Sequence, residues 1–192
     1  MIQTDKFAKV EIRGADALWD WLADHHEQDE SVWLVTWKKD RPERYVSRDA
    51  VLDALVAHGW IDGIRRKLDA ARTMQLISPR KQQAWAESYK RRAAQLEQGG
   101  LLREPGRAAI ARAKAAGSWD AMAAVDALEV PADLQVALDA RREATATFAG
   151  CAPSYRRNVL RWIAGAKRPA TRAKRVAVAA DHAAAGTRVP QM

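Results

Sequence analysis

The chain contains a single cysteine, Cys151, among its 192 residues. An intrachain disulfide is therefore excluded, and no cluster of thiolates is available to hold zinc. Long apolar runs are also missing, because no stretch approaches the roughly 18 apolar residues that a membrane-spanning helix needs. The first residues lack the basic and then apolar order of a secretory signal. We therefore expect a cytoplasmic protein that does not insert into a membrane.

The sequence also lacks the common motifs of metal, phosphate and nucleophile sites. Its four histidines have no metal-ligand spacing. In Asp24-His25-His26-Glu27, adjacent helical residues would point about 100° apart and could not clasp one ion well. A Gly-rich phosphate loop, a nucleophile elbow and a serine triad signature are absent. We expect no metal and no cofactor, and the sequence leaves open whether the protein is an enzyme.

Apolar residues, in contrast, are plentiful enough for a core. They make up 48% of the chain, which holds eight tryptophans, and such a composition argues against disorder. A chain of this length fits one compact domain or two small ones.

Charge is distributed unevenly along the chain. Residues 1–40 carry nine Asp or Glu against five Lys or Arg, whereas residues 131–192 carry eleven Lys or Arg against four Asp or Glu. Residues 151–175, called the basic block below, contain eight basic residues and no acidic one. The basic block could attract phosphates. It could equally be the solvated face of a helix, which is the usual role of a charge run.

Hydrophobic periodicity predicts a mixed N-terminal half. Leu18, Trp21 and Leu22 recur at helical spacing, the segment after Ser31 is β-branched and aromatic, and Ser47 is a good N-cap. Gly59 supplies a helix stop and Pro79 ends a strand. The expected elements are helices over 15–26 and 48–58 and strands over 31–38, 61–68 and 73–78.

Beyond residue 83 every segment has helical character. We expect helices over 84–98, 105–116, 131–140, 141–149, 153–167 and 169–185. The chain loses its aromatics near Trp119, and Pro131 stands at a favoured first-turn position. The sequence thus predicts an α+β fold with a small antiparallel sheet and helices over residues 1–125, followed by a helical C-terminal region over 126–192.

Five motifs are more specific together than singly. They are Val32-Trp33-Leu34-Val35 with Lys38-Lys39, Gly59-Trp60-Ile61-Asp62-Gly63, Ser78-Pro79-Arg80 with Trp85, Gly117-Ser118-Trp119-Asp120, and Ala166-Lys167-Arg168-Pro169-Ala170-Thr171-Arg172 with Arg175. Through these motifs, over nearly its whole length, the chain resembles the YdeI/OmpD-associated family of bacteriocin-protection proteins. The resemblance implies a cytoplasmic bacterial protein with an α+β N-terminal part and a helical C-terminal part. It also implies a link with bacteriocin resistance or envelope stress, but no particular reaction.

The chain departs from that family at several small polar positions. The family tends to have Thr in place of Ser78, Ser in place of Ala84 and Ala86, and Asn in place of Tyr89. These differences weaken the transfer of any family ligand site to this helix start.

The candidate site comprises Trp60, Asp62, Arg80 and Trp85. A short hairpin between the two motifs that hold them should return residues near 62 and 80 to one neighbourhood. We expect the four side chains to line one pocket that binds a small polar or anionic ligand. Arg80 and Lys81, just before the expected helix containing Trp85, could converge with its N-terminal N–H groups on one anion. Alternatively, Asp62 caps local backbone N–H groups, or pairs with Arg65, Arg66 or Arg80, and so fixes the turn.

Two other hypotheses belong to different functional classes. Asp62 beside an indole could act as the general base of an unrecognised hydrolase or transferase. The basic block could instead serve a module that binds nucleic acid or an acidic partner. The expected helix over 153–167 turns Tyr155, Val159 and Trp162 inward and away from its arginines, whereas single-strand readers expose aromatics among basic groups. We therefore expect nucleic-acid binding to be weak and nonspecific at most, and the oligomeric state is open.

Overall fold

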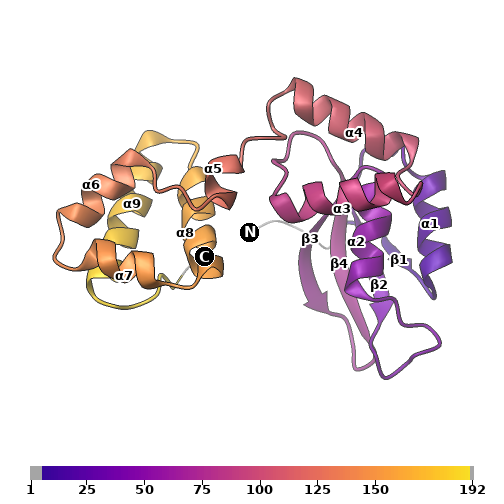
Figure 1. Cartoon of the computed structure of the whole chain (residues 1–192). Helices are drawn as coiled ribbons and strands as arrows, with labels where there is room; N and C mark the ends of the chain where they lie inside the picture. Colours follow the sequence, from indigo (N-terminus) through magenta and orange to yellow (C-terminus); the bar gives the residue numbers. More distant parts are fainter. Residues whose placement is uncertain (1–5, 191–192) are drawn as a thin grey trace. The chain divides into compact units, whose positions relative to one another are not determined.

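A computed structural model describes residues 6–190. The chain divides into two compact units, residues 1–120 and residues 121–192 (Figure 1). The division falls at Asp120, five residues before the boundary expected from composition. No helix within the described part of the chain is long and apolar enough to cross a membrane.

The N-terminal unit contains a four-stranded sheet. Its strands are β1 (Lys9–Glu11), β2 (Val32–Trp37), β3 (Trp60–Lys67) and β4 (Arg72–Pro79), in the order β1-β2-β4-β3. The pairs β2/β4 and β3/β4 are antiparallel, as expected, but β1 runs parallel to β2. The sheet is therefore mixed rather than purely antiparallel. β1 could not be predicted from the sequence, because three residues are too few to show an alternation.

Four helices accompany this sheet. They are α1 (Ala15–Asp24), α2 (Arg48–Ala57), α3 (Glu87–Gln98) and α4 (Glu104–Ala115). Ser47 caps α2 as expected, because its hydroxyl accepts the N–H of Ala50 at 3.1 Å. α1 and α2 share a core with the sheet, and α3 and α4 both pack against α2 (Figure 1).

The main core lies between α1, α2 and one face of the sheet. Leu34 and Ile77 face the helices from β2 and β4, and Leu18 and Leu55 meet them from α1 and α2. Each such side chain contributes roughly 1.5–3 kcal/mol by leaving water. All of β2 except its last residue is buried, as expected for a strand covered on both faces.

Two glycines set the crossing of α4 and the end of α2. A Cβ on Gly106 would lie 2.3 Å from the carbonyl oxygen of Ala57, and a Cβ on Gly59 would lie 2.7 Å from that of Pro105. Gly59 also has a φ of 75°, in the left-handed region that favours glycine. The start of α4 can therefore approach the end of α2 only where both side chains are absent.

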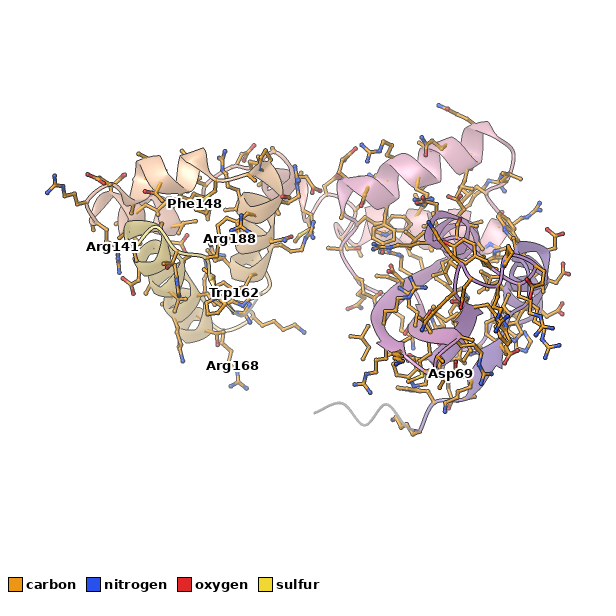
Figure 2. All side chains as sticks on the ribbon, turned by 90° about the horizontal axis from the view of Figure 1, so that it is seen from below. Asp69, Arg141, Phe148, Trp162, Arg168 and Arg188 are labelled. Atoms are coloured by element: carbon orange, nitrogen blue, oxygen red, sulfur yellow. The ribbon has the colours of Figure 1, made fainter. Side chains whose placement is uncertain are left out.

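The C-terminal unit is helical throughout, as expected. It contains α5 (Ala123–Asp126), α6 (Ala132–Asp139), α7 (Ala144–Gly150), α8 (Pro153–Ala164) and α9 (Pro169–Ala184). α9 packs against α6, α7 and α8 around a core that includes Leu134, Phe148 and Ile163. Trp162 turns inward as expected, because it packs against this core, but it is only half-buried. Arg168 points away from the helices (Figure 2).

Candidate functional site

The β3–β4 hairpin brings the two sequence motifs together. Trp60 pairs with Pro79 and Asp62 pairs with Ile77, so the residue after β4 lies beside the turn before β3. There the N–H of Arg80 donates to the carbonyl of Gly59 at 2.9 Å. The expected return of residue 80 to the neighbourhood of residue 62 is thus a direct result of strand register.

Asp62 is held by two side chains that the sequence analysis did not assign to the site. Its Oδ1 accepts a hydrogen bond from the hydroxyl of Tyr89, and its Oδ2 accepts one from Nε2 of Gln75 at 2.9 Å. A bulge in β3 directly follows Asp62. The carboxylate therefore joins the sheet to α3, and it neither caps the local turn nor forms a direct ion pair with Arg80.

Arg80 is the most unusual side chain of this region, because it is charged and only 3% exposed. Its Cζ lies 4.0 Å from the centre of the Trp85 ring and 5.0 Å from that of Tyr89. Nη1 makes long contacts of 3.5 and 3.4 Å with the carbonyls of Gln83 and Ala84. The other two nitrogens, Nε and Nη2, are buried and have no hydrogen-bond partner among residues 6–190.

Burial sets the electrostatics of this group. Removal of the Arg80 guanidinium from water lowers its pKa to about 10, although the nearby Tyr89 and Asp62 favour the charged form. Arg80 consequently stays positive at neutral pH. Burial, together with the bond to Asp62, raises the pKa of Tyr89, so its hydroxyl keeps its proton and remains a donor.

Trp85 lies outside the helix in which we expected it. α3 begins at Glu87, and the N–H of Trp85 donates instead to the carbonyl of Ser118 at 3.2 Å. That distant bond fixes the segment before α3 as a loop, which lays the indole under Arg80. Lys81 is exposed and pairs with Asp29 at 3.2 Å, so it does not converge with Arg80 on a helix start.

Trp60 occupies a different environment from the other three candidates. It is buried in the main core, and its ring meets that of Trp21 edge-on at a centroid distance of 5.6 Å. The structure thus gathers Asp62, Arg80 and Trp85 around Tyr89, and it places Trp60 beside them as part of the sheet packing.

A cavity of about 290 Å³ adjoins Arg80. We call it the Arg80 cavity; the polar side chains on its wall are His26, His58, Arg80, Glu104 and Arg112. They come from the ends of α1, α2 and β4 and from α4. α4 begins here at Glu104 without a side-chain cap, so its positive end contributes to the potential of the cavity.

His58 gives the cavity a neutral imidazole. Its Nδ1 lies 2.8 Å from the carbonyl of Ala54, which can only accept, so Nδ1 carries the proton. Burial lowers the pKa of His58, and the nearby charge of Arg103 acts in the same direction. At neutral pH its Nε2 is therefore an acceptor.

The arrangement suits binding of an anion more than it suits metal binding. Within the described part of the chain, no group of three or more His, Cys, Asp or Glu could hold a metal ion. Two guanidiniums and a helix start face one carboxylate on the cavity wall.

Among the site residues that were not predicted, only Tyr89 could have been found from the sequence. It follows Trp85 by four residues, which is one turn of the helix that was predicted there.

Comparison with known proteins divides the chain in the same way as the structure. Residues 10–109 match a family described as "Domain of unknown function (DUF8412)". Residues 127–186 match the family described as "Bacteriocin-protection, YdeI or OmpD-Associated", which confirms the resemblance expected from the motifs over this part of the chain. No curated protein and no solved structure matches the chain significantly.

Proposed function

We propose, for a chain that belongs to the family described as a domain of unknown function (DUF8412), that its N-terminal unit binds a small anion in the Arg80 cavity. The C-terminal region of the chain belongs to the YdeI/OmpD-associated, bacteriocin-protection family. The candidate ligand-binding residues are Arg80 with Trp85 and Asp62 beside it. Trp60 supports them from the core.

The observation that carries the proposal is the pair of unsatisfied N–H groups on buried Arg80. A buried donor without a partner costs roughly 1–3 kcal/mol, and more when it is charged. The guanidinium carbon of Arg80 lies over the rings of Trp85 and Tyr89, and a ring face offers no oxygen or nitrogen acceptor to the N–H groups. A carboxylate or phosphate accepts two parallel hydrogen bonds in the plane of a guanidinium. Such a ligand in the Arg80 cavity would neutralise the charge, and it would satisfy both buried donors once the guanidinium turns toward the cavity.

The size and lining of the cavity narrow the ligand class. Its volume of about 290 Å³ is close to the lower end of small-molecule sites, which begin at roughly 300 Å³. Inorganic phosphate or a carboxylate of a few carbons fits this space. Glu104 and the Nε2 of His58 are acceptors, so a hydroxyl or amino group on the ligand would find a partner. We therefore favour a small hydroxy or amino acid, or a small phosphate.

Asp62 has a positioning role in this proposal. Both of its oxygens are already engaged by Tyr89 and Gln75, and a general base needs one oxygen directed at the substrate. Its bonds hold the Tyr89 ring against Arg80. Binding, rather than hydrolysis or group transfer, is thus the function that this geometry supports best.

The nucleic-acid alternative finds less support in the basic block. Arg157 and Arg161 face Asp126, and Arg172 pairs with Asp133. Two more cations contact the C-terminal unit itself, since Arg175 donates to the carbonyl of Trp162 and Arg156 lies over Phe148. Five of the eight cations of the basic block therefore contact groups within the C-terminal unit, which leaves fewer of them to bind phosphates.

The proposal also includes a cellular setting. We place the protein in the cytoplasm, where a small metabolite anion would be its ligand, and we connect binding with the bacteriocin protection named for the family of its C-terminal region. A strain lacking the gene should then lose bacteriocin tolerance, and an Arg112→Gln allele should fail to restore it.

Mass spectrometry on the natively purified protein tests the binding proposal. A small acid or phosphate should be released on denaturation of the wild-type chain, and it should be depleted in Arg80→Gln and in Arg112→Gln. The second variant guards against misfolding, because Arg112 is exposed. Lys81→Gln is the matched control, since it removes a neighbouring cation that does not line the cavity. Equal ligand content in all four proteins would refute the proposal.

A further inference from the structure

A second hollow of about 450 Å³ lies on the N-terminal unit, between α3 and α4. We call it the α3–α4 groove. Its apolar lining consists of Ala93, Ala94, Leu102, Ile110, Ala111 and Trp119. It shares no lining residue with the Arg80 cavity.

The helical pattern explains why the groove exists. Lining residues recur at 90, 93, 94 and 97 on α3 and at 107, 110, 111 and 114 on α4, so each helix presents one face to the hollow. α3 and α4 both pack more closely on α2 than on each other. Alanines at the middle of both faces are too small to bridge the remaining space. The groove is therefore a consequence of two helices supported by a third.

One end of the groove is positively charged. The ammonium groups of Lys90 and Lys114 lie 5.3 and 5.2 Å from the centre of the Trp119 ring. Lys90 also contacts Asp120 at 3.1 Å, but this carboxylate side chain is 76% exposed, so water screens the pair. At the other end, Arg107 and Glu97 compensate each other at 3.3 Å. Positive charge in excess is thus confined to the end marked by Trp119.

We propose that the α3–α4 groove binds an amphipathic organic anion, which has an apolar body and one carboxylate or sulfonate head. The body lies on the alanines, Leu102 and Ile110, and the head lies between Lys90 and Lys114. The volume falls within the range of small-molecule sites, and an apolar wall with a few convergent polar groups is the usual composition of such a site. A neutral amphiphile would gain the apolar contact but would lack the charge pairing. A cationic amphiphile would be repelled by Lys90 and Lys114.

Calorimetric titration with octanoate tests this proposal on the full-length chain. We expect one saturable site in the wild type. Ala111→Phe and Ala94→Phe, which fill the groove from opposite walls, should each weaken binding at least tenfold. Both positions are exposed, so the variants should fold, and circular dichroism would check this. Ala115→Phe is the matched control, because this exposed alanine lies on α4 outside the groove.

Charge substitutions test the head-group contact separately. Lys114→Gln should weaken octanoate binding severalfold, whereas Lys167→Gln, in the other unit, should not. Octylammonium should bind at least tenfold more weakly than octanoate. Arg112→Gln should leave octanoate binding unchanged, which separates this groove from the Arg80 cavity. Wild-type affinity in both phenylalanine variants, or equal affinity for octanoate and octylammonium, would overturn the proposal.

Discussion

At the scale of single residues, the guanidinium of Arg80 has a defined place but an incomplete set of partners. It lies over the rings of Trp85 and Tyr89, the carbonyls of Gln83 and Ala84 contact Nη1, and two nitrogens remain unsatisfied. Cation–π contacts with desolvated groups contribute about 2 kcal/mol, so the stacking offsets part of the cost of burial. A bound anion would offset the remaining free-energy cost of burying the guanidinium.

Tyr89 is expected to be a structural support of the site. Tyr89→Phe removes the hydroxyl that donates to Asp62 and leaves a half-buried carboxylate with Gln75 as its remaining partner. We expect the free energy of unfolding to fall by about 1–3 kcal/mol, measured by urea titration. Tyr45→Phe, in which the ring is also half-buried, is the control. An unchanged stability for Tyr89→Phe would show that Asp62 does not depend on this bond.

His58 should make stability depend on pH. Burial lowers its pKa below the ordinary value of 6.5 in the folded state, so the unfolded chain binds a proton more readily. Stability should therefore be fully present above about pH 6.5 and should decline as pH falls toward the folded pKa. In His58→Gln this part of the decline should vanish, as seen by urea titration between pH 7.5 and 5. Exposed His25→Gln is the control, and parallel profiles for the wild type and His58→Gln would contradict the assignment.

Sequence reasoning placed Asp62, Arg80 and Trp85 in one region but missed the residues that organise them. Tyr89 reaches Asp62 because α3 packs on α2, which itself packs on β3. Gln75 reaches Asp62 because strand register places the two residues on one face of the sheet. His58 and Arg112 line the same cavity because α2 and α4 cross there. Contacts of this kind depend on tertiary packing, which residue spacing along the chain does not encode.

At the scale of elements, the start of α4 depends on a glycine in an unusual way. Replacing a helical glycine by alanine normally stabilises a protein by up to about 1 kcal/mol. Gly106→Ala should instead destabilise it by about 1–3 kcal/mol, because the new Cβ would collide with the backbone of Ala57. The same variant should weaken anion binding by displacing the positive start of α4 from the Arg80 cavity.

Gly150→Ala is the matched control for this substitution. Gly150 ends α7, and a Cβ built there meets nothing within 4 Å. The thermal midpoint of the Gly150→Ala variant should equal that of the wild type or rise slightly. If Gly106→Ala behaved like Gly150→Ala, the close approach of α4 to α2 would not be required.

Most elements could be predicted because their patterns are long and regular. Strands β2, β3 and β4 and helices such as α2, α8 and α9 show clear alternation, helical spacing or caps. β1 and α5 were not predicted, because with three and four residues they are too short to show such a pattern. The predicted helix containing Trp85 began too early, because helix propensity alone does not reveal that a distant carbonyl at Ser118 captures the Trp85 amide.

At the scale of the whole molecule, the C-terminal unit carries the larger share of the net positive charge. Residues 121–192 carry eleven Lys or Arg and six Asp or Glu. Five cations of the basic block contact the C-terminal unit itself. The other three, Lys167, Arg168 and Lys174, are the ones that would attract phosphates. Arg168 points into solvent (Figure 2). An extended polyanion would therefore meet few available charges.

Binding of oligonucleotides should accordingly be weak and sensitive to salt. With about three phosphates neutralised, the logarithm of the association constant should fall with that of salt concentration by a slope no steeper than about −3. Fluorescence anisotropy with random and structured oligonucleotides at low and physiological salt measures this slope. Lys167→Gln with Lys174→Gln should weaken this binding further, because only Arg168 of the three available cations remains. Tight, sequence-selective binding at physiological salt would instead favour the nucleic-acid hypothesis.

The side-chain NMR signal of Arg80 is the most direct measure of whether the Arg80 cavity takes an anion. Its Nε–Hε group is buried, lies beside the Trp85 ring and lacks an acceptor among the described residues. The signal can be assigned by its loss in Arg80→Lys and followed at neutral pH, where the group is charged. Phosphate and small hydroxy acids should shift it saturably in the wild type, and far less in Arg112→Gln. A signal that stays fixed while those of surface arginines move would contradict the account.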